Sequence, residues 1–257
     1  MKTPTALHYE ITGSGPTVVL LHGYMASSKY WARVSEQLSH NHRVIALDLL
    51  GFGKSPKPSC SRYDYEAQLR SIDATLDQLG VRGQFTLVGH SMGSLVALRY
   101  ARERSHRIKR LLLTNMPIWQ DPEQAKGDVL GAHPIYRYIL QPGLHSFFWI
   151  AFRIAIRFSL LPEQLTTDLR KRRDYLFQSS STSRLRSLRN VIYAAKVEAD
   201  LTALTVKTVI LSGIRDNKNY LLNLDPMQLG SHILRHRVDE GHHLPLQRPE
   251  LVAQFIG

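Results

Sequence analysis

The sequence contains one cysteine, Cys60, in 257 residues. An intrachain disulfide is therefore impossible, and the cysteine usage gives no indication of an oxidising compartment. The same count excludes metal sites built from several cysteines. The first residues, Met1–Thr5, lack the apolar stretch of a secretory signal peptide. These absences predict a cytoplasmic protein.

Long uninterrupted apolar runs are also missing. The most apolar segment, residues 144–158, carries Arg153 and Arg157 one helical turn apart and is too short and too charged to span a bilayer. Its pattern favours a helix whose apolar face packs on the protein core. The alternative is a helix that rests on an anionic lipid surface. Peripheral contact with an anionic membrane therefore stays open.

Acidic residues are scarce, with 21 Asp and Glu against 33 Lys and Arg, which gives a net charge of +12. Such an excess is typical of proteins that bind nucleic acid, anionic membranes or acidic substrates, but a solvated surface accounts for it equally well. Basic runs such as Arg170–Arg173 come without a nucleic-acid-binding motif, so we expect no nucleic-acid partner. Nothing in the sequence fixes an oligomeric state.

Short apolar runs alternate with helical patterns along the chain. This alternation predicts βαβ units and hence an α/β fold, with a mostly parallel sheet covered by helices on both faces. The expected strands are 7–12, 17–21, 43–47, 85–89, 110–114, 208–212 and 231–238, and the clearest expected helices are 31–38, 65–79, 95–104 and 249–256.

The interval from residue 116 to residue 205 breaks this alternation. It has no clear buried strand, and its helical stretches are interrupted by Pro134, Pro142 and Pro162. We interpret 116–205 as a helical cap inserted into a core made of 1–115 and 206–257. Because ligands bind at the carboxyl ends of parallel strands, the cap is expected to lie over that edge.

The most informative stretch is Gly89-His90-Ser91-Met92-Gly93, which follows an apolar strand and precedes a helical pattern. It has the G-x-S-x-G spacing of a nucleophile elbow, in which a serine lies on a sharp strand-to-helix turn. Such a turn places the serine in a strained backbone conformation and exposes its hydroxyl. A structural turn with the same spacing is the alternative, and the strand before and helix after favour the functional interpretation.

A serine hydroxyl needs a neighbouring base, usually histidine, and the histidine needs a carboxylate to orient it. Among twelve histidines, His242 and His243 lie in a loop after the last expected strand, where an imidazole can return to the elbow. Asp216 follows the strand 208–212 and is the candidate acid. Asp239 and Glu240 are closer in sequence, but neighbours on a short loop are poorly placed to reach the far nitrogen of the imidazole.

Taken in order, these motifs resemble those of α/β hydrolases, in particular the serine esterases, lipases and haloperoxidase-like enzymes. The resemblance covers nearly the whole chain, and its order of serine, aspartate and histidine is that of the family. The matching segments are 21–24 (Leu-His-Gly-Tyr), 48–55, 89–93, 213–216 and 241–242.

The resemblance implies a role for each matched residue. Ser91 would be the nucleophile, Asp216 the orienting acid and His242 the base, since the family's base directly follows the glycine of its loop. The backbone N–H groups of Tyr24 and Met92 would form the oxyanion hole. Such enzymes need neither a metal nor an organic cofactor, so we expect none here.

Two further segments beside the site are interpreted as structural. The glycines of Gly51–Ser55 resemble a phosphate-binding loop, but the P-loop spacing is missing, so we expect a turn. His22 is expected to organise the loop that follows the strand 17–21 through hydrogen bonds.

The function predicted from these residues is a serine carboxylesterase or lipase-like hydrolase with a small-molecule ester of an apolar acyl group as substrate. Carbon–carbon bond hydrolases and cofactor-free haloperoxidases also use serine on this fold, so they remain alternatives. A non-catalytic binding module of the same fold is a third, although all three triad positions are filled.

Overall fold

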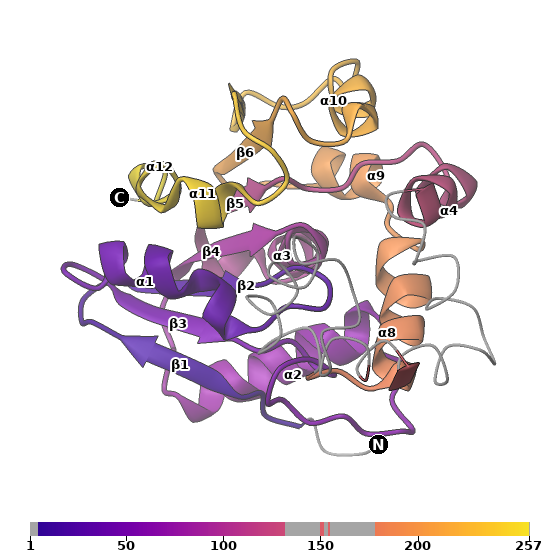
Figure 1. Ribbon diagram of the computed structural model, residues 1–257. Coiled ribbons are helices and arrows are strands. Elements are labelled where there is room, and N and C mark those ends of the chain that lie inside the picture. The colour runs from indigo at the N-terminus through magenta and orange to yellow at the C-terminus, as the bar shows by residue number, and fades with distance from the viewer. Residues whose placement is uncertain (1–4, 132–149, 152–153, 155–177, 257) are drawn as a thin grey trace.

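The computed structural model describes residues 5–131, 150–151, 154 and 178–256. The described chain forms one seven-stranded sheet in the order β1-β3-β2-β4-β5-β6-β7 (Figure 1). Strand β1 pairs antiparallel with β3, and the remaining pairs are parallel. The strands are β1 (Tyr9–Thr12), β2 (Thr17–Leu21), β3 (Arg43–Leu47), β4 (Phe85–His90), β5 (Ile108–Thr114), β6 (Thr208–Gly213) and β7 (Ile233–Val238).

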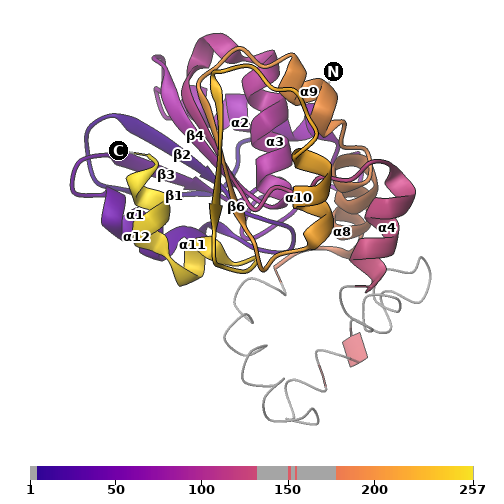
Figure 2. The same cartoon turned by 90° about the horizontal axis from the view of Figure 1, so that it is seen from above.

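Helices cover both faces of this sheet, as predicted (Figure 2), and the sheet separates two apolar clusters. Alternate residues of β2 point to opposite faces, so Val19 and Leu21 belong to one apolar cluster while Val18 and Leu20 belong to the other. One face is covered by α2 (Tyr65–Gln78), α3 (Met92–Glu103) and α9 (Val197–Thr202), the other by α1 (Ala32–Leu38), α11 (Leu244–Gln247) and α12 (Pro249–Gln254).

The predicted helix 65–79 corresponds closely to α2. The side chain of Asp64 caps its first turn by accepting a hydrogen bond from the N–H of Ala67 at 3.0 Å. Gly80 follows the helix with φ +69°, the left-handed conformation that commonly ends helices. The capping residue and the stop residue therefore explain both boundaries.

The segment Gly51–Ser55 forms a turn around a buried carboxylate, which confirms its structural interpretation. Asp48 accepts hydrogen bonds from the backbone N–H groups of Lys54 at 2.7 Å and Ser28 at 2.5 Å. A Cβ at Gly53, where φ is +51°, would lie 2.2 Å from the Asp48 carboxyl carbon. The turn wraps the carboxylate so closely that only glycine can occupy this position.

His22 joins two loops through its ring nitrogens, as predicted. Its Nε2 accepts a hydrogen bond from the backbone N–H of Leu49 at 3.0 Å, so the proton is on Nδ1, which donates to the carbonyl of Gly23 at 2.7 Å. Burial lowers the pKa of this imidazole, although Asp48 and the Gly23 carbonyl oppose the shift. A neutral His22 thus fixes the loop that follows β2.

Between residues 116 and 205 the described chain is helical. It contains α4 (Pro122–Gly131), α8 (Ser181–Ser187), the π-helical turn η3 (Leu188–Ile192) and α9. The division into core and cap stays a prediction. Apart from Ile150, Ala151 and Ile154, the apolar segment 144–158 lies outside the described residues, as does the basic run 170–173.

Within the described ranges, no helix is both long enough and apolar enough to cross a membrane.

Candidate active site

The nucleophile elbow has the strained geometry that the sequence predicts. Strand β4 ends at His90, α3 begins at Met92, and Ser91 between them has φ 52° and ψ −122°. A Cβ on Gly93 would lie 2.2 Å from the carbonyl oxygen of Leu21. The start of α3 therefore passes so close to β2 that glycine is required. The positive φ of Ser91 is a conformation that a non-glycine residue adopts only at a cost of about 1–3 kcal/mol.

The structure brings together Ser91, His242 and Asp216, which lie in the loops that follow β4, β7 and β6. The Nε2 atom of His242 is 3.1 Å from the Ser91 Oγ, and its Nδ1 is 2.8 Å from the Asp216 Oδ2. An ionised carboxylate only accepts hydrogen bonds, so Nδ1 carries the proton and Nε2 presents its lone pair to the serine. The neighbouring His243 instead places its Nδ1 3.3 Å from the hydroxyl of Tyr30.

Asp216 is buried, and its environment nevertheless favours the charged form. Burial raises the pKa of its carboxyl group, but hydrogen bonds from His242, from the amide of Asn115 and from the backbone N–H of Asn217 outweigh burial, so that the pKa is lowered. The Asn115 amide is 2.8 Å from Oδ2, and the Asn217 N–H is 2.7 Å from Oδ1. Asp216 is therefore ionised at neutral pH and holds the proton of His242 on Nδ1.

Asn115 is a site residue that the sequence interpretation missed. It directly follows β5, and its amide also donates to the carbonyl of Gly241, the residue before His242, at 3.2 Å. Its position at the carboxyl end of a central strand, beside the strand that leads to Asp216, was the available signal.

His90, the variable residue before the serine, is fully buried beneath the base. Its ring stacks on Tyr30 with centroids 4.8 Å apart and lies 5.0 Å from the ring of His242. Burial, followed by the proximity of His242 and His243, holds the pKa of His90 well below its usual range, although a hydrogen bond with Thr114 opposes this shift. His90 is therefore neutral at pH 7, so it adds no positive charge beside His242.

The loop after β2 lies against the nucleophile. A Cβ on Gly23 would be 3.1 Å from the Cβ of Ser91, and Tyr24 is the next residue. Met92 is the first residue of α3, so its N–H is one of the four that a helix leaves without an intrahelical acceptor. Both backbone segments predicted for the oxyanion hole therefore lie beside Ser91.

A cavity of about 750 Å³ opens onto the serine. This volume lies within the range of about 300–1,000 Å³ that is common for small-molecule sites. Its wall is largely aromatic and aliphatic, from segments far apart in the sequence. The lining includes Tyr24, Trp119, Leu188, Ile192 and Tyr220.

Asp128 of α4 lines this cavity and forms hydrogen bonds with several neighbouring side chains. Its carboxylate accepts hydrogen bonds from the indole N–H of Trp119 at 2.9 Å, the amide of Asn217 at 2.9 Å and the amide of Asn219 at 2.9 and 3.0 Å. These bonds tie α4 to the loop that carries Asp216 and to α10 (Lys218–Leu224). The described start of the interval 116–205 is thus attached directly to the acid loop.

A family model for the alpha/beta hydrolase fold matches residues 16–247. The chain belongs to the α/β-hydrolase fold family. This match agrees with the mostly parallel sheet and with the fold expected from the sequence.

Individual relatives of this α/β hydrolase carry different activities in their names. The chain is 34% identical over 132 residues to probable lysophospholipase BODYGUARD 4 of Arabidopsis thaliana, which covers 51% of this chain and 31% of that protein. It is also 37% identical over 119 residues to a cis-3-alkyl-4-alkyloxetan-2-one decarboxylase of Shewanella oneidensis. That match covers 46% of this chain and 37% of the decarboxylase. The similarity thus spans about a third of these curated relatives.

Among solved structures, the fold is similar to that of a thermophilic esterase from Thermogutta terrifontis. The sequence identity is 27%, the TM-score is 0.72, and the match covers 100% of this chain and 96% of the esterase.

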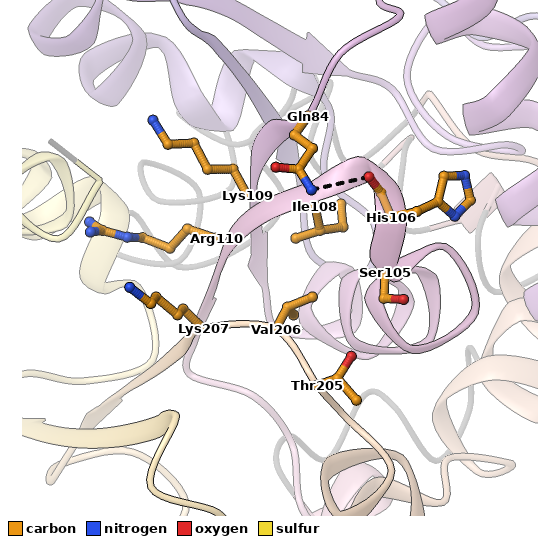
Figure 3. A pocket seen from close by; sticks show the side chains of 9 residues that line it. All are labelled: Gln84, Ser105, His106, Ile108, Lys109, Arg110, Thr205, Val206 and Lys207. Atoms are coloured by element: carbon orange, nitrogen blue, oxygen red, sulfur yellow. Dashed lines mark hydrogen bonds between the residues drawn. The ribbon is translucent and has the colours of Figure 1, made fainter.

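A second pocket in this α/β hydrolase, of about 510 Å³, lies at the amino ends of β5 and β6, away from the elbow (Figure 3). Lys109, Arg110 and Lys207 line it, and their side chains extend to the same side (Figure 3). Gln84 at its rim donates a hydrogen bond to the carbonyl of His106 at 3.2 Å. Ser91, Asp216 and His242 are not among the residues that line this second pocket.

Among the residues that the structure describes, no group of three metal-ligating side chains lies close enough together to hold an ion.

Proposed function

We propose that the protein is a serine hydrolase of the carboxylesterase or lipase-like type that cleaves esters of apolar acyl groups. The observation that carries the proposal is the chain of contacts from Ser91 Oγ to His242 Nε2 at 3.1 Å and from His242 Nδ1 to Asp216 Oδ2 at 2.8 Å. This sequence of nucleophile, base and orienting carboxylate is the arrangement that activates a serine hydroxyl.

In the first step, the Ser91 oxygen attacks the ester carbonyl carbon while its proton passes to Nε2 of His242. The ionised Asp216 stabilises the imidazolium that forms. The carbonyl oxygen becomes an oxyanion, which the N–H groups of Tyr24 and Met92 would bind. Removing one such donor typically costs about 3 kcal/mol of transition-state stabilisation.

In the second step, the proton on His242 passes to the departing alcohol oxygen, and the acyl group remains on Ser91. A water molecule then attacks the acyl carbon and gives a proton to Nε2. That proton returns to the Ser91 oxygen as the carboxylic acid leaves, so the enzyme is regenerated. This sequence involves no redox step.

The cavity and the relatives support this choice of substrate class. A wall of Trp119, Tyr220, Leu188 and Ile192 suits an apolar acyl chain, because burying apolar surface contributes about 25 cal/mol per Å². One similar structure is that of an esterase, and one partial relative is named as a lysophospholipase. Both names describe acyl-ester chemistry.

Carbon–carbon bond cleavage is the second candidate. The relative from Shewanella oneidensis is named as a decarboxylase, which shows that relatives of this chain include a protein named for a reaction other than ester hydrolysis. With the same base and oxyanion donors, a serine that attacked one carbonyl of a 1,3-diketone would form an acyl-serine and release the other fragment as an enolate. That enolate would take up the proton held by His242, and water would then hydrolyse the acyl-serine. Measuring ester turnover separates the two candidates.

Turnover of p-nitrophenyl acetate, butyrate and octanoate tests the proposal. We expect wild-type protein to hydrolyse these esters, and Ser91→Ala and His242→Ala each to lower kcat by about 10⁴-fold or more. Asp216→Asn should lower kcat by about 10⁴-fold, because an asparagine oxygen cannot stabilise the imidazolium as a carboxylate does.

Circular dichroism and thermal unfolding provide the control that each variant remains folded. Folded wild-type protein that turns over none of the esters would contradict the proposal. A collapse of activity in His243→Ala, with activity retained in His242→Ala, would move the role of base to the second histidine.

A further inference from the structure

The amide of Asn115 connects the loop of the acid to the loop of the base. Its Nδ2 donates to Asp216 Oδ2 at 2.8 Å and to the carbonyl of Gly241 at 3.2 Å. The side chain is buried, and the backbone N–H of Asn115 is bonded to Leu211 of β6. One side chain at the end of β5 therefore fixes two loops that follow β6 and β7.

Only the donor half of this amide is used. Among the described residues, its oxygen Oδ1 is buried without a hydrogen-bond partner. Rotating the amide by 180° would place Oδ1 against the Asp216 carboxylate and the Gly241 carbonyl, which are both acceptors, so the observed orientation is the favourable one. The backbone φ of Asn115 is +48°, a further local cost. An unpaired buried oxygen and a left-handed backbone therefore accompany the two hydrogen bonds that Asn115 donates.

The oxygen that Asn115 contacts is the one that faces the base. Asp216 Oδ2 accepts from both Asn115 Nδ2 and His242 Nδ1, at 2.8 Å each. The second oxygen, Oδ1, accepts from the N–H of Asn217. With both oxygens held, the carboxylate cannot rotate away from the imidazole.

We propose that Asn115 is a positioning residue, which holds Asp216 in the orientation that keeps His242 Nδ1 protonated and Nε2 directed at Ser91. This role rests on the proposed serine hydrolase function. It requires a hydrogen-bond donor at position 115. An isosteric carboxylate at this position would face Asp216 as a like charge, so an aspartate can substitute only in its protonated form, which donates a hydrogen bond.

Two substitutions separate this role from simple packing. Asn115→Leu keeps the approximate size and removes both donors, and we expect kcat per active site to fall about 10- to 100-fold with KM changed less than about threefold. In Asn115→Asp the new carboxyl lies against Asp216, and two carboxyls this close share a proton, so the variant keeps a donor to Asp216 only while that proton is bound. Its kcat relative to wild type should therefore fall as the pH rises, towards the level of Asn115→Leu.

The other titratable groups around the base and the acid are the same in every variant, so they do not account for this pH dependence. Neutral His90 and the ring of His243 pack against His242. On the side of Asp216, the described titratable group is Tyr220.

Asn223 provides a matched control. It is also a buried asparagine, and its amide donates at 2.9 Å to both the Ile118 carbonyl and the Gln124 side chain, neither of which belongs to the triad. Asn223→Leu and Asn223→Asp should lower thermal stability while leaving the pH dependence of kcat unchanged. Titration with a fluorophosphonate counts active sites, so that losses from misfolding are separated from losses in kcat.

A kcat of Asn115→Asp that keeps the same ratio to wild type at every pH, or a kcat within about twofold of wild type in Asn115→Leu, would overturn the assignment. Should the leucine variant not fold, Asn115→Gly takes its place, because glycine adopts φ +48° without strain and also removes the donor. Failure of the proposed function has a different signature, namely no ester turnover by wild-type protein.

Discussion

At the scale of single residues, Asp48 illustrates how a buried carboxylate organises the loops around the site. Burial raises the pKa of its carboxyl group. The charge that His22 carries once acid protonates it, and the backbone N–H groups of Ser28 and Lys54, outweigh burial and lower the pKa below its usual value. A carboxyl whose pKa is lower in the folded state stabilises the fold above its unfolded pKa of about 3.9. This contribution is lost as pH falls through the lower, folded pKa.

Replacing this carboxylate by an amide tests whether the ionisation of Asp48 makes stability depend on pH. We expect Asp48→Asn to lower the free energy of unfolding by about 2 kcal/mol near pH 7, because charge-assisted hydrogen bonds are lost. The difference from wild type should shrink as the pH falls below about 4 and through the lower pKa of the folded state, where the wild-type carboxylate becomes protonated. Urea unfolding at a series of pH values measures both quantities.

Asp239→Asn is the control, since this carboxylate is exposed and pairs with Arg215 at the surface. Its free energy of unfolding should change by less than about 0.5 kcal/mol. A pH-independent loss in Asp48→Asn would show that the contribution of Asp48 is not electrostatic.

The sequence alone could predict the roles of residues that belong to a spaced motif just after an apolar strand. Ser91 and Asp216 directly follow apolar strands, so their edge of the sheet was predictable. Asn115 also follows a strand directly, so its edge of the sheet was predictable, but its role was not. Asn115 and His90 act through Asp216 and Tyr30, which are 101 and 60 residues away, and no local pattern encodes such contacts.

At the scale of elements, the approach of α3 to β2 depends on Gly93. We expect Gly93→Ala to lower the free energy of unfolding by about 2 kcal/mol or more, because its Cβ would meet the Leu21 and His22 carbonyl oxygens at 2.2 and 2.5 Å, and backbone atoms must move. Urea unfolding of the purified variant measures the effect.

Gly127 in α4 is the matched glycine, since a Cβ there would have nothing within 4 Å. Gly127→Ala should leave stability unchanged or raise it by up to about 1 kcal/mol through helix propensity. Wild-type stability in Gly93→Ala would contradict the close packing of α3 on β2.

Elements with strong periodicity were predictable, and short elements were not. The buried strands β2, β3 and β6 lie within one residue of their expected ranges. Helix α11 (Leu244–Gln247) was missed because four residues carry no helical period and Pro245 suggests a break. Leu244 is fully buried, so tertiary packing rather than local propensity explains this turn.

At the scale of the whole molecule, the alternation of strands and helices along the chain predicts the family and the fold. It does not predict the substrate. The cavity wall is assembled from Tyr24, Trp119, Leu188 and Tyr220, so its shape depends on how distant segments pack. Contact of the basic cap with an anionic membrane, and a cytoplasmic location, stay predictions. The segments on which membrane contact depends lie mostly outside the described residues.

The central claim is that Ser91 is the activated nucleophile, and mass spectrometry after reaction with a fluorophosphonate tests it most directly. We expect one covalent adduct, on the peptide that contains Ser91, which is absent in Ser91→Ala and formed more slowly in His242→Ala. An adduct on another residue, or none in folded wild-type protein, would contradict it.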